Sequence, residues 1–168
     1  MGSETHSVTV RPAGPSDGDA FLQLVAGLAD YESYPPPDAA GRVRLLEDAF
    51  GERKRFDVLL AEIEGRAVGY AVIFETYSTF LARPKLYLED LFIHPQFRGS
   101  GAGRALFVAC AHEALRRGCV RMQWTVLDWN ASAIRFYQQL GAEYEKTWHW
   151  YGLDEDGLRQ LSSAKIIR

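Results

Sequence analysis

The stretch FRGSGAGRALF, from Phe97 to Phe107, places three glycines within five residues, directly before a helical pattern. Each glycine costs conformational entropy on folding, so such a stretch usually serves a close approach to the backbone. Helix N-termini bind phosphate through free N–H groups and the helix dipole, and Arg98 and Arg104 would add positive charge. The spacing fits neither the dinucleotide-binding fingerprint nor the Walker A loop. We therefore predict a phosphate site of another kind, with a flexible turn that binds nothing as the alternative.

A second group of residues that could take part in catalysis is the carboxylate pair Glu89 and Asp90. The pair lies within the otherwise apolar stretch KLYLEDLFI. Neighbouring residues of a strand point to opposite faces of a sheet, so we expect these two side chains to face opposite sides. An unpaired charge in such a strand would be costly. The pair therefore indicates functional carboxylates, with a structural hydrogen bond as the alternative for Asp90.

The elements that must position these residues follow from hydrophobic periodicity and turn signals. Strands are expected at residues 7–11, 56–63, 67–76, 85–93, 120–127 and 143–153. Helices are expected from Ser16 or Asp17 to the prolines at 35–37, from Asp38 to near Phe50, over 103–117, from Asn130 or Ser132 to Leu140, and from near Asp154. Central hairpins followed by βα units predict an α/β fold of the mixed α+β kind. Its central sheet would be mixed, with helices on both faces.

The composition of the 168 residues is that of one soluble domain, with 47% hydrophobic and 24% charged residues. A net charge of −3 without a basic stripe argues against nucleic acid, and no apolar run is long enough for a membrane span. The N-terminus lacks the apolar core of a signal peptide, so a cytoplasmic location is expected. Residues 1–6 are expected to be disordered and residues 7–168 to form one domain. Cysteine and histidine spacing predicts reduced thiols and no metal site.

The run RGSGAG, Arg98 to Gly103, matches the Q/R-x-x-G-x-G/A signature, so the chain resembles the GCN5-related N-acetyltransferase (GNAT) superfamily. The stretches LYLEDLFIHPQFRGSGAG and VLDWNASAIRFYQQLGA, with LADYE and LLEDAFGE before them, are similar to its diamine branch, the spermidine/spermine and thialysine enzymes. The resemblance implies a GNAT fold with a mostly antiparallel, twisted sheet. It also implies strands that splay apart at a site for acetyl-CoA, the expected cofactor.

In this family the glycine loop holds the pyrophosphate of acetyl-CoA, and N–H groups freed by the splay bind the acetyl carbonyl and the pantetheine arm. Asn130 resembles the family asparagine near the splay, with a plain helix N-cap as its alternative. The cofactor-binding residues that the resemblance implies are Leu91, Phe92, Ile93, Arg98, Gly99, Ser100, Gly101, Ala102, Gly103, Arg104, Asn130, Ala133 and Tyr137.

Acetyl transfer to an amine requires a deprotonated amine, a donor for the oxyanion and a proton for the departing thiolate. The resemblance makes Tyr137 the general acid, although it shares a helical face with apolar residues and a core position is its alternative. It makes Glu89 a general base acting through water or an amine-binding carboxylate, and these two are the expected catalytic residues.

The resemblance also implies an amine site of carboxylates and aromatic faces, which suit a cation. Its expected residues are Tyr31, Glu32, Glu89, Asp90, Gln123, Trp124, Thr125 and Trp148. For Trp148 and Trp150, which would lie on the same side of the last strand, a core pair is the alternative. Arg83 and Lys85 near the site suit a long polycation poorly, which favours a short diamine or a lysine analogue.

The sequence thus predicts direct acetyl transfer, in a ternary complex, to a primary amine of a small cationic substrate such as a diamine, polyamine or lysine analogue. One alternative function is the same acetyl transfer to a different acceptor, an amine of a protein, an amino acid or an antibiotic. The other is an acyl-CoA-binding module with little catalysis. Because the diamine branch often pairs through its sheets and C-terminal elements, a homodimer is expected, without nucleic acid, membrane or metal partners.

Overall fold

The protein is represented by a computed structural model that describes residues 7–163. The expected disorder of residues 1–6 lies outside this range. The chain divides into two compact units, the first ending at Thr125 and the second beginning at Val126, and each is considered by itself.

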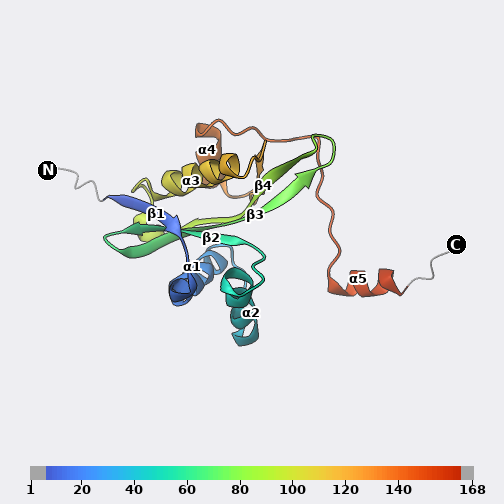
Figure 1. Cartoon of the computed structure of the whole chain (residues 1–168), viewed down its shortest axis with the longest axis horizontal. Coiled ribbons are helices and arrows are strands. Elements are labelled where there is room, and N and C mark those ends of the chain that lie inside the picture. Colours follow the sequence, from blue (N-terminus) through green and yellow to red (C-terminus); the bar gives the residue numbers. More distant parts are fainter. Residues whose placement is uncertain (1–6, 164–168) are drawn as a thin grey trace. The chain divides into compact units, whose positions relative to one another are not determined.

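The first unit contains a five-stranded sheet (Figure 1). Its strands, which lie in sequence order across the sheet, are β1 (Val8–Pro12), β2 (Asp57–Ile63), β3 (Arg66–Ser78), β4 (Arg83–Ile93) and β5 (Met122–Gln123). Three pairings are antiparallel, and only β4 and β5 run parallel. This topology confirms the predicted mixed, mostly antiparallel sheet.

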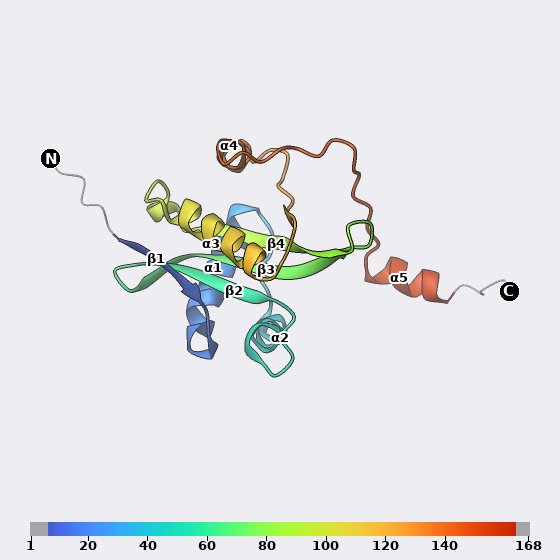
Figure 2. The ribbon, with the colours of Figure 1, turned by 45° about the horizontal axis from the view of Figure 1, so that its top comes forward.

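Helices cover both faces of this sheet, as the sequence predicts (Figure 2). They are α1 (Gly18–Tyr31) and α2 (Ala39–Phe50) on one face and α3 (Ala102–Arg116) on the other. Phe21 of α1 packs on Tyr70 of β3 in the first of two cores, and Leu106 of α3 is fully buried in the second. Apolar side chains buried on both sides of the sheet hold its strands in place, because burial of apolar surface drives folding.

Local signals set the helix ends close to their predicted positions. The Asp38 carboxylate accepts a 2.6 Å hydrogen bond from the Gly41 amide and caps α2. α3 is flanked by Gly101 and Gly118, both with positive φ. In the second unit, Asp154 caps α5 (Glu155–Ser162), which follows α4 (Ala131–Gln139).

One predicted strand is much shorter than expected, and another is absent. The strand expected at residues 120–127 pairs with β4 only at Met122 and Gln123, and no strand forms within residues 143–153. A strand needs a neighbouring strand for its backbone hydrogen bonds, and alternating side chains alone do not supply one. The expected loop at 78–84 is also shorter, because β3 runs to Ser78 and β4 starts at Arg83.

Trp148 and Trp150 were predicted to lie on one side of that missing strand, with a core pair as the alternative. Both side chains are largely exposed, at 72% and 74% of their surface. The alternative of a buried core pair is therefore wrong in the unit as described.

Gly69 of β3 is a point at which the sheet tolerates no side chain. It is paired with Ile93 of β4, and a methyl group on it would lie 2.5 Å from the Phe92 carbonyl oxygen and would also clash with the Ile93 side chain. We expect Gly69→Ala to lower the free energy of unfolding by about 1–3 kcal/mol, because the strands would have to separate. Chemical denaturation measures this change.

The matched control is Gly14→Ala. Gly14 has a φ of −127°, and nothing lies within 4 Å of an added methyl group. Its effect should stay within about 0.5 kcal/mol of zero. Equal stability of the Gly69→Ala and Gly14→Ala proteins would contradict the close approach of β3 and β4.

Candidate active site

The glycine loop joins the end of β4 to the start of α3. After Ile93 the chain makes one 3₁₀ turn at Pro95–Phe97, and then Gly99 and Gly101 adopt φ values of 84° and 90°. This backbone region favours glycine, because other residues are strained there. Nothing lies within 4 Å of the position that a Cβ would take on either glycine. The loop is thus open on the side from which a ligand would approach its backbone.

The N-terminus of α3 presents N–H groups next to this open space. The Ala105 amide donates to the Gly101 carbonyl, so the amides of the preceding residues lie ahead of the first intrahelical bond. The Ser100 hydroxyl accepts a hydrogen bond from one of them, that of Ala102. Arg104 is exposed in the first turn of the helix. Open amides at a helix N-terminus beside an arginine can bind an anion, and the phosphate site itself stays a prediction.

Arg98 connects the loop to the end of α1. Its Nε donates a long, 3.4 Å hydrogen bond to the Ile93 carbonyl, and its guanidinium carbon lies 4.4 Å from the centre of the Tyr31 ring. Sequence reasoning assigned Arg98 to the coenzyme and Tyr31 to the amine. The structure brings the two side chains into contact, so the two expected sites adjoin each other.

A β-bulge interrupts β4 at the carboxylate pair. Ile73 of β3 pairs with Leu88, and Val72 pairs with Asp90, which leaves Glu89 without an opposing residue. Leu88 and Leu91 consequently both pack on the α3 side of the sheet, although three positions separate them. One extra residue thus shifts the regular alternation at Glu89, and the expectation that Glu89 and Asp90 face opposite sides of the sheet stays a prediction.

The bulge coincides with the separation of β4 from β5. The parallel ladder between them consists of Leu86 with Met122 and Tyr87 with Gln123. Beyond it, β4 continues to Ile93 paired with β3 but not with β5. The His94 amide donates to Val68 on β3. Because N–H directions alternate along a strand, the amides of Leu91 and Ile93 point to the opposite edge, where the sheet is open.

Asp90 lies on the α1 side of the sheet, bound to a buried tyrosine. The Tyr70 hydroxyl donates a 3.1 Å hydrogen bond to its carboxylate, and the Tyr70 ring is fully buried against Phe21 of α1. Sequence reasoning missed Tyr70, which appears only as one aromatic residue within the apolar stretch AVGYAVIF. This hydrogen bond from Tyr70 is the structural role that was the alternative interpretation of Asp90.

The electrostatic surroundings of Asp90 are negative. Burial raises its pKa from 3.8 to about 6, the Tyr70 hydrogen bond opposes this rise, and the charges of Glu89 and Glu32 add to it. Burial also raises the pKa of Glu32, which directly follows α1. The groups that act on Asp90 are thus a hydroxyl and two other carboxylates. A site of this kind favours a cationic ligand.

Residues 123–125, where β5 separates from β4, differ in orientation. Gln123 accepts a 2.8 Å hydrogen bond from the Lys85 ammonium, and Thr125 is exposed. The Trp124 ring packs edge-to-face on Phe107 of α3, with ring centres 5.1 Å apart. The structure therefore places Trp124 on the α3 side of the sheet, away from the face that carries Asp90.

The remaining expected residues belong to the second unit. The Asn130 side chain accepts a 3.1 Å hydrogen bond from the Ala133 amide and caps α4, as its alternative reading predicts. Tyr137 lies partly buried on α4 with its ring 5.4 Å from that of Phe136, and Trp148 is exposed. The roles of these residues toward coenzyme and substrate stay predictions.

Within residues 7–163, no three His, Cys, Asp or Glu side chains gather in a way that could hold a metal ion. None of the helices in that same range is both long and apolar enough to cross a membrane.

Comparison with known proteins gives consistent results. The pattern of the Acetyltransferase (GNAT) family matches residues 24–142. Thialysine N-epsilon-acetyltransferase of Sus scrofa is 34% identical over 167 residues, which cover 93% of this chain and 98% of the relative. L-ornithine N5-acetyltransferase of Arabidopsis thaliana is 38% identical over 98 residues, 58% of this chain and 43% of the relative.

Among solved structures, an integron cassette protein from the mobile metagenome of V. cholerae has a TM-score of 0.79. It is 23% identical, and the match covers 94% of this chain and 99% of that protein, so it supports the fold alone. The family pattern, the full-length relatives and the glycine loop between β4 and α3 agree. The chain belongs to the GNAT family of acetyl-CoA-dependent N-acetyltransferases.

Proposed function

We propose that this enzyme acetylates the primary amine of a small cationic substrate, a short diamine or a lysine-like amino acid. The observation that carries the proposal is the carboxylate cluster at the bulge. The charges of Glu89 and Glu32 both act on Asp90, and no protein cation is among the groups that do so. The names of the relatives, a thialysine and an L-ornithine acetyltransferase, support a substrate with an amine at the end of a short chain.

The residues that would hold acetyl-CoA are those of the glycine loop and the open strand edge. The backbone from Gly99 to Arg104, with Arg98, would bind the pyrophosphate, and the amides of Leu91 and Ile93 would bind the acetyl carbonyl and the pantetheine arm. Positive φ at two glycines, the open space above them and the open edge of β4 fit this group. When bound, acetyl-CoA supplies the acetyl group as a reactive thioester.

On the amine side, Asp90 would bind the substrate ammonium, while Tyr70 holds its carboxylate in place. Glu89, exposed at the bulge, would accept the proton that the ammonium must lose before it attacks, directly or through a water molecule. Tyr31, which precedes Glu32, would offer the cation the face of its ring that Arg98 does not cover. Tyr137 would donate a proton to the departing thiolate.

Three further features belong to the proposal. The two units would work together as one acetyltransferase domain of residues 7–168. The enzyme would be a cytoplasmic protein, and it would be a homodimer, for which light scattering of the purified chain is the direct test.

The general-acid role predicts that Tyr137→Phe lowers kcat by about 10²-fold, because the thiolate would leave without its proton donor. Steady-state kinetics with acetyl-CoA and ornithine measure this, and calorimetry should show unchanged coenzyme binding. Tyr144→Phe, an exposed position of the same unit, is the matched control. A kcat that Tyr137→Phe leaves unchanged would remove Tyr137 from the mechanism.

The coenzyme site predicts that Gly101→Val weakens acetyl-CoA binding by at least about tenfold, because a branched side chain would fill the space over the loop. Gly118→Val is the control, since Gly118 also has positive φ and open space but lies at the far end of α3. Both variants carry backbone strain of about 1–3 kcal/mol. Equal coenzyme affinity of the two folded variants would contradict the assignment of the loop.

The role of Asp90 predicts opposite effects on stability and binding. Its folded-state pKa is raised from 3.8 to about 6, so it contributes stability at low pH that is lost as the pH rises through this window. Asp90→Asn should therefore raise the free energy of unfolding at pH 8 by about 1–3 kcal/mol, but not at pH 4. Denaturation at both pH values measures the change.

The same Asp90→Asn variant should raise the KM for the amine by more than about tenfold at pH 8, because a charged hydrogen-bond partner is lost. Asp19→Asn, at the exposed start of α1, is the control for both measurements. A variant that is stabilised at pH 8 and still binds the amine normally would show that Asp90 is a structural carboxylate alone.

A further inference from the structure

Lys85 of β4 carries a half-buried positive charge that the proposed reaction does not use. Its ammonium donates a 2.8 Å hydrogen bond to the side-chain carbonyl of Gln123. Within the described residues, no carboxylate lies at ion-pair distance from it. A neutral amide leaves the ammonium with donors for an anionic ligand.

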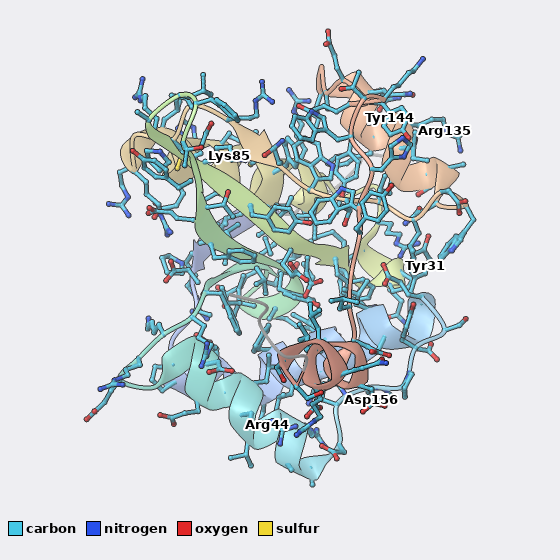
Figure 3. The ribbon with its side chains drawn as sticks, turned by 90° about the vertical axis from the view of Figure 1, so that its right-hand side faces the viewer. Tyr31, Arg44, Lys85, Arg135, Tyr144 and Asp156 are labelled. Atoms are coloured by element: carbon cyan, nitrogen blue, oxygen red, sulfur yellow. The ribbon has the colours of Figure 1, made fainter. Side chains whose placement is uncertain are left out.

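Lys85 lies on the same face of the sheet as Asp90. Leu86 and Leu88 pack on the α3 side of the sheet. Lys85 and Tyr87, which alternate with them along β4, therefore point to the other side, where α1 lies. Met122 packs with the α3-side core as well, which places its neighbour Gln123 on the α1 side. Figure 3 shows Lys85 on the sheet and Tyr31 at the end of α1.

The hydrogen bond to Gln123 also gives Lys85 a direction. Gln123 is the partner of Tyr87, two residues closer to the bulge than Lys85. Holding the ammonium there turns the lysine along the strand toward Asp90. About three residues of strand then separate the two charged groups, which corresponds to roughly 10 Å. An extended ornithine or lysine is shorter than this from its terminal amine to its carboxylate, and a hydrogen bond at each end makes up the difference.

We propose that Lys85, held by Gln123, binds the carboxylate of an amino-acid substrate whose terminal amine lies at Asp90. The inference deepens the proposed function and rests on it, because it selects diamino acids over diamines. Diamines lack the carboxylate and would leave the Lys85 charge unpaired.

The neighbouring Arg83 does not compete for this role. Its guanidinium donates a 3.1 Å hydrogen bond to the carbonyl of Gly118, at the C-terminal end of α3. The side chain is thus directed away from the face that carries Asp90. Of the two basic residues that the sequence places near the site, the geometry selects Lys85.

The test uses two pairs of substrates that differ only by a carboxylate, ornithine against putrescine and lysine against cadaverine. Wild-type kcat/KM should be at least about tenfold higher for the amino acid of each pair. Lys85→Met should remove this preference by lowering kcat/KM for the amino acids and raising it for the diamines, which no longer leave a charge unpaired. Lys85→Arg keeps the charge and should retain most of the preference.

Lys54→Met, the same substitution at an exposed loop position, is the control and should behave as the wild type. A wild-type preference for diamines, or an equal effect of Lys85→Met on both members of a pair, would overturn the subsite.

Equilibrium binding separates this inference from the proposed function. If none of the four amines is acetylated, the proposed function fails. Calorimetry must then still show tighter binding of ornithine than of putrescine, and the difference must vanish in Lys85→Met. Equal binding of the two ligands to the wild type would overturn the carboxylate subsite on its own.

Discussion

The arrangement of the site depends on one extra residue in β4. Without the bulge at Glu89, Asp90 would point to the α3 side together with Leu88, because side chains alternate along a regular strand. With it, Asp90 meets the hydroxyl of Tyr70 beneath α1. The same irregularity lies where β4 ceases to pair with β5, so carboxylates and open backbone amides occur at one point of the sheet.

The first unit separates opposite charges along β4. Negative charge gathers at Glu89, Asp90 and Glu32, whereas the loop after β4 carries Arg98 and the N-terminus of α3. The contact of Arg98 with the Tyr31 ring is where these two regions meet. A cationic amine and an anionic coenzyme would each find a complementary charge, with their reacting ends close to the bulge.

Lys85 adds a third charge on the same face, at the other end of the carboxylate cluster. Its bond to Gln123 keeps the ammonium partly buried without neutralising it. A face with a carboxylate at one end and an ammonium at the other matches a molecule of the opposite arrangement. Charge placement, rather than the shape of a pocket, then distinguishes an amino acid from a diamine, since an unpaired buried charge is costly.

The sequence by itself determined the features that depend on neighbouring residues. Asp38 caps its helix as predicted, the last helix begins next to Asp154, and the glycine loop joins a strand to a helix, because caps and positive φ are local properties. The motif from Arg98 to Gly103 was sufficient to predict the family. The sequence also identified Glu89 and Asp90 as candidate site residues, because carboxylates are unusual in an apolar strand.

Tertiary structure alone decided how these residues face one another. Strand pairing is a contact between distant segments, so the pattern over residues 120–127 did not reveal that pairing ends at Gln123, nor did KLYLEDLFI reveal the bulge. The partner of Asp90 is Tyr70, twenty residues earlier, and only the pairing of β3 with β4 brings them together. The sequence thus predicted which residue types could take part in the reaction, and the long-range register of the strands determined how those residues are arranged.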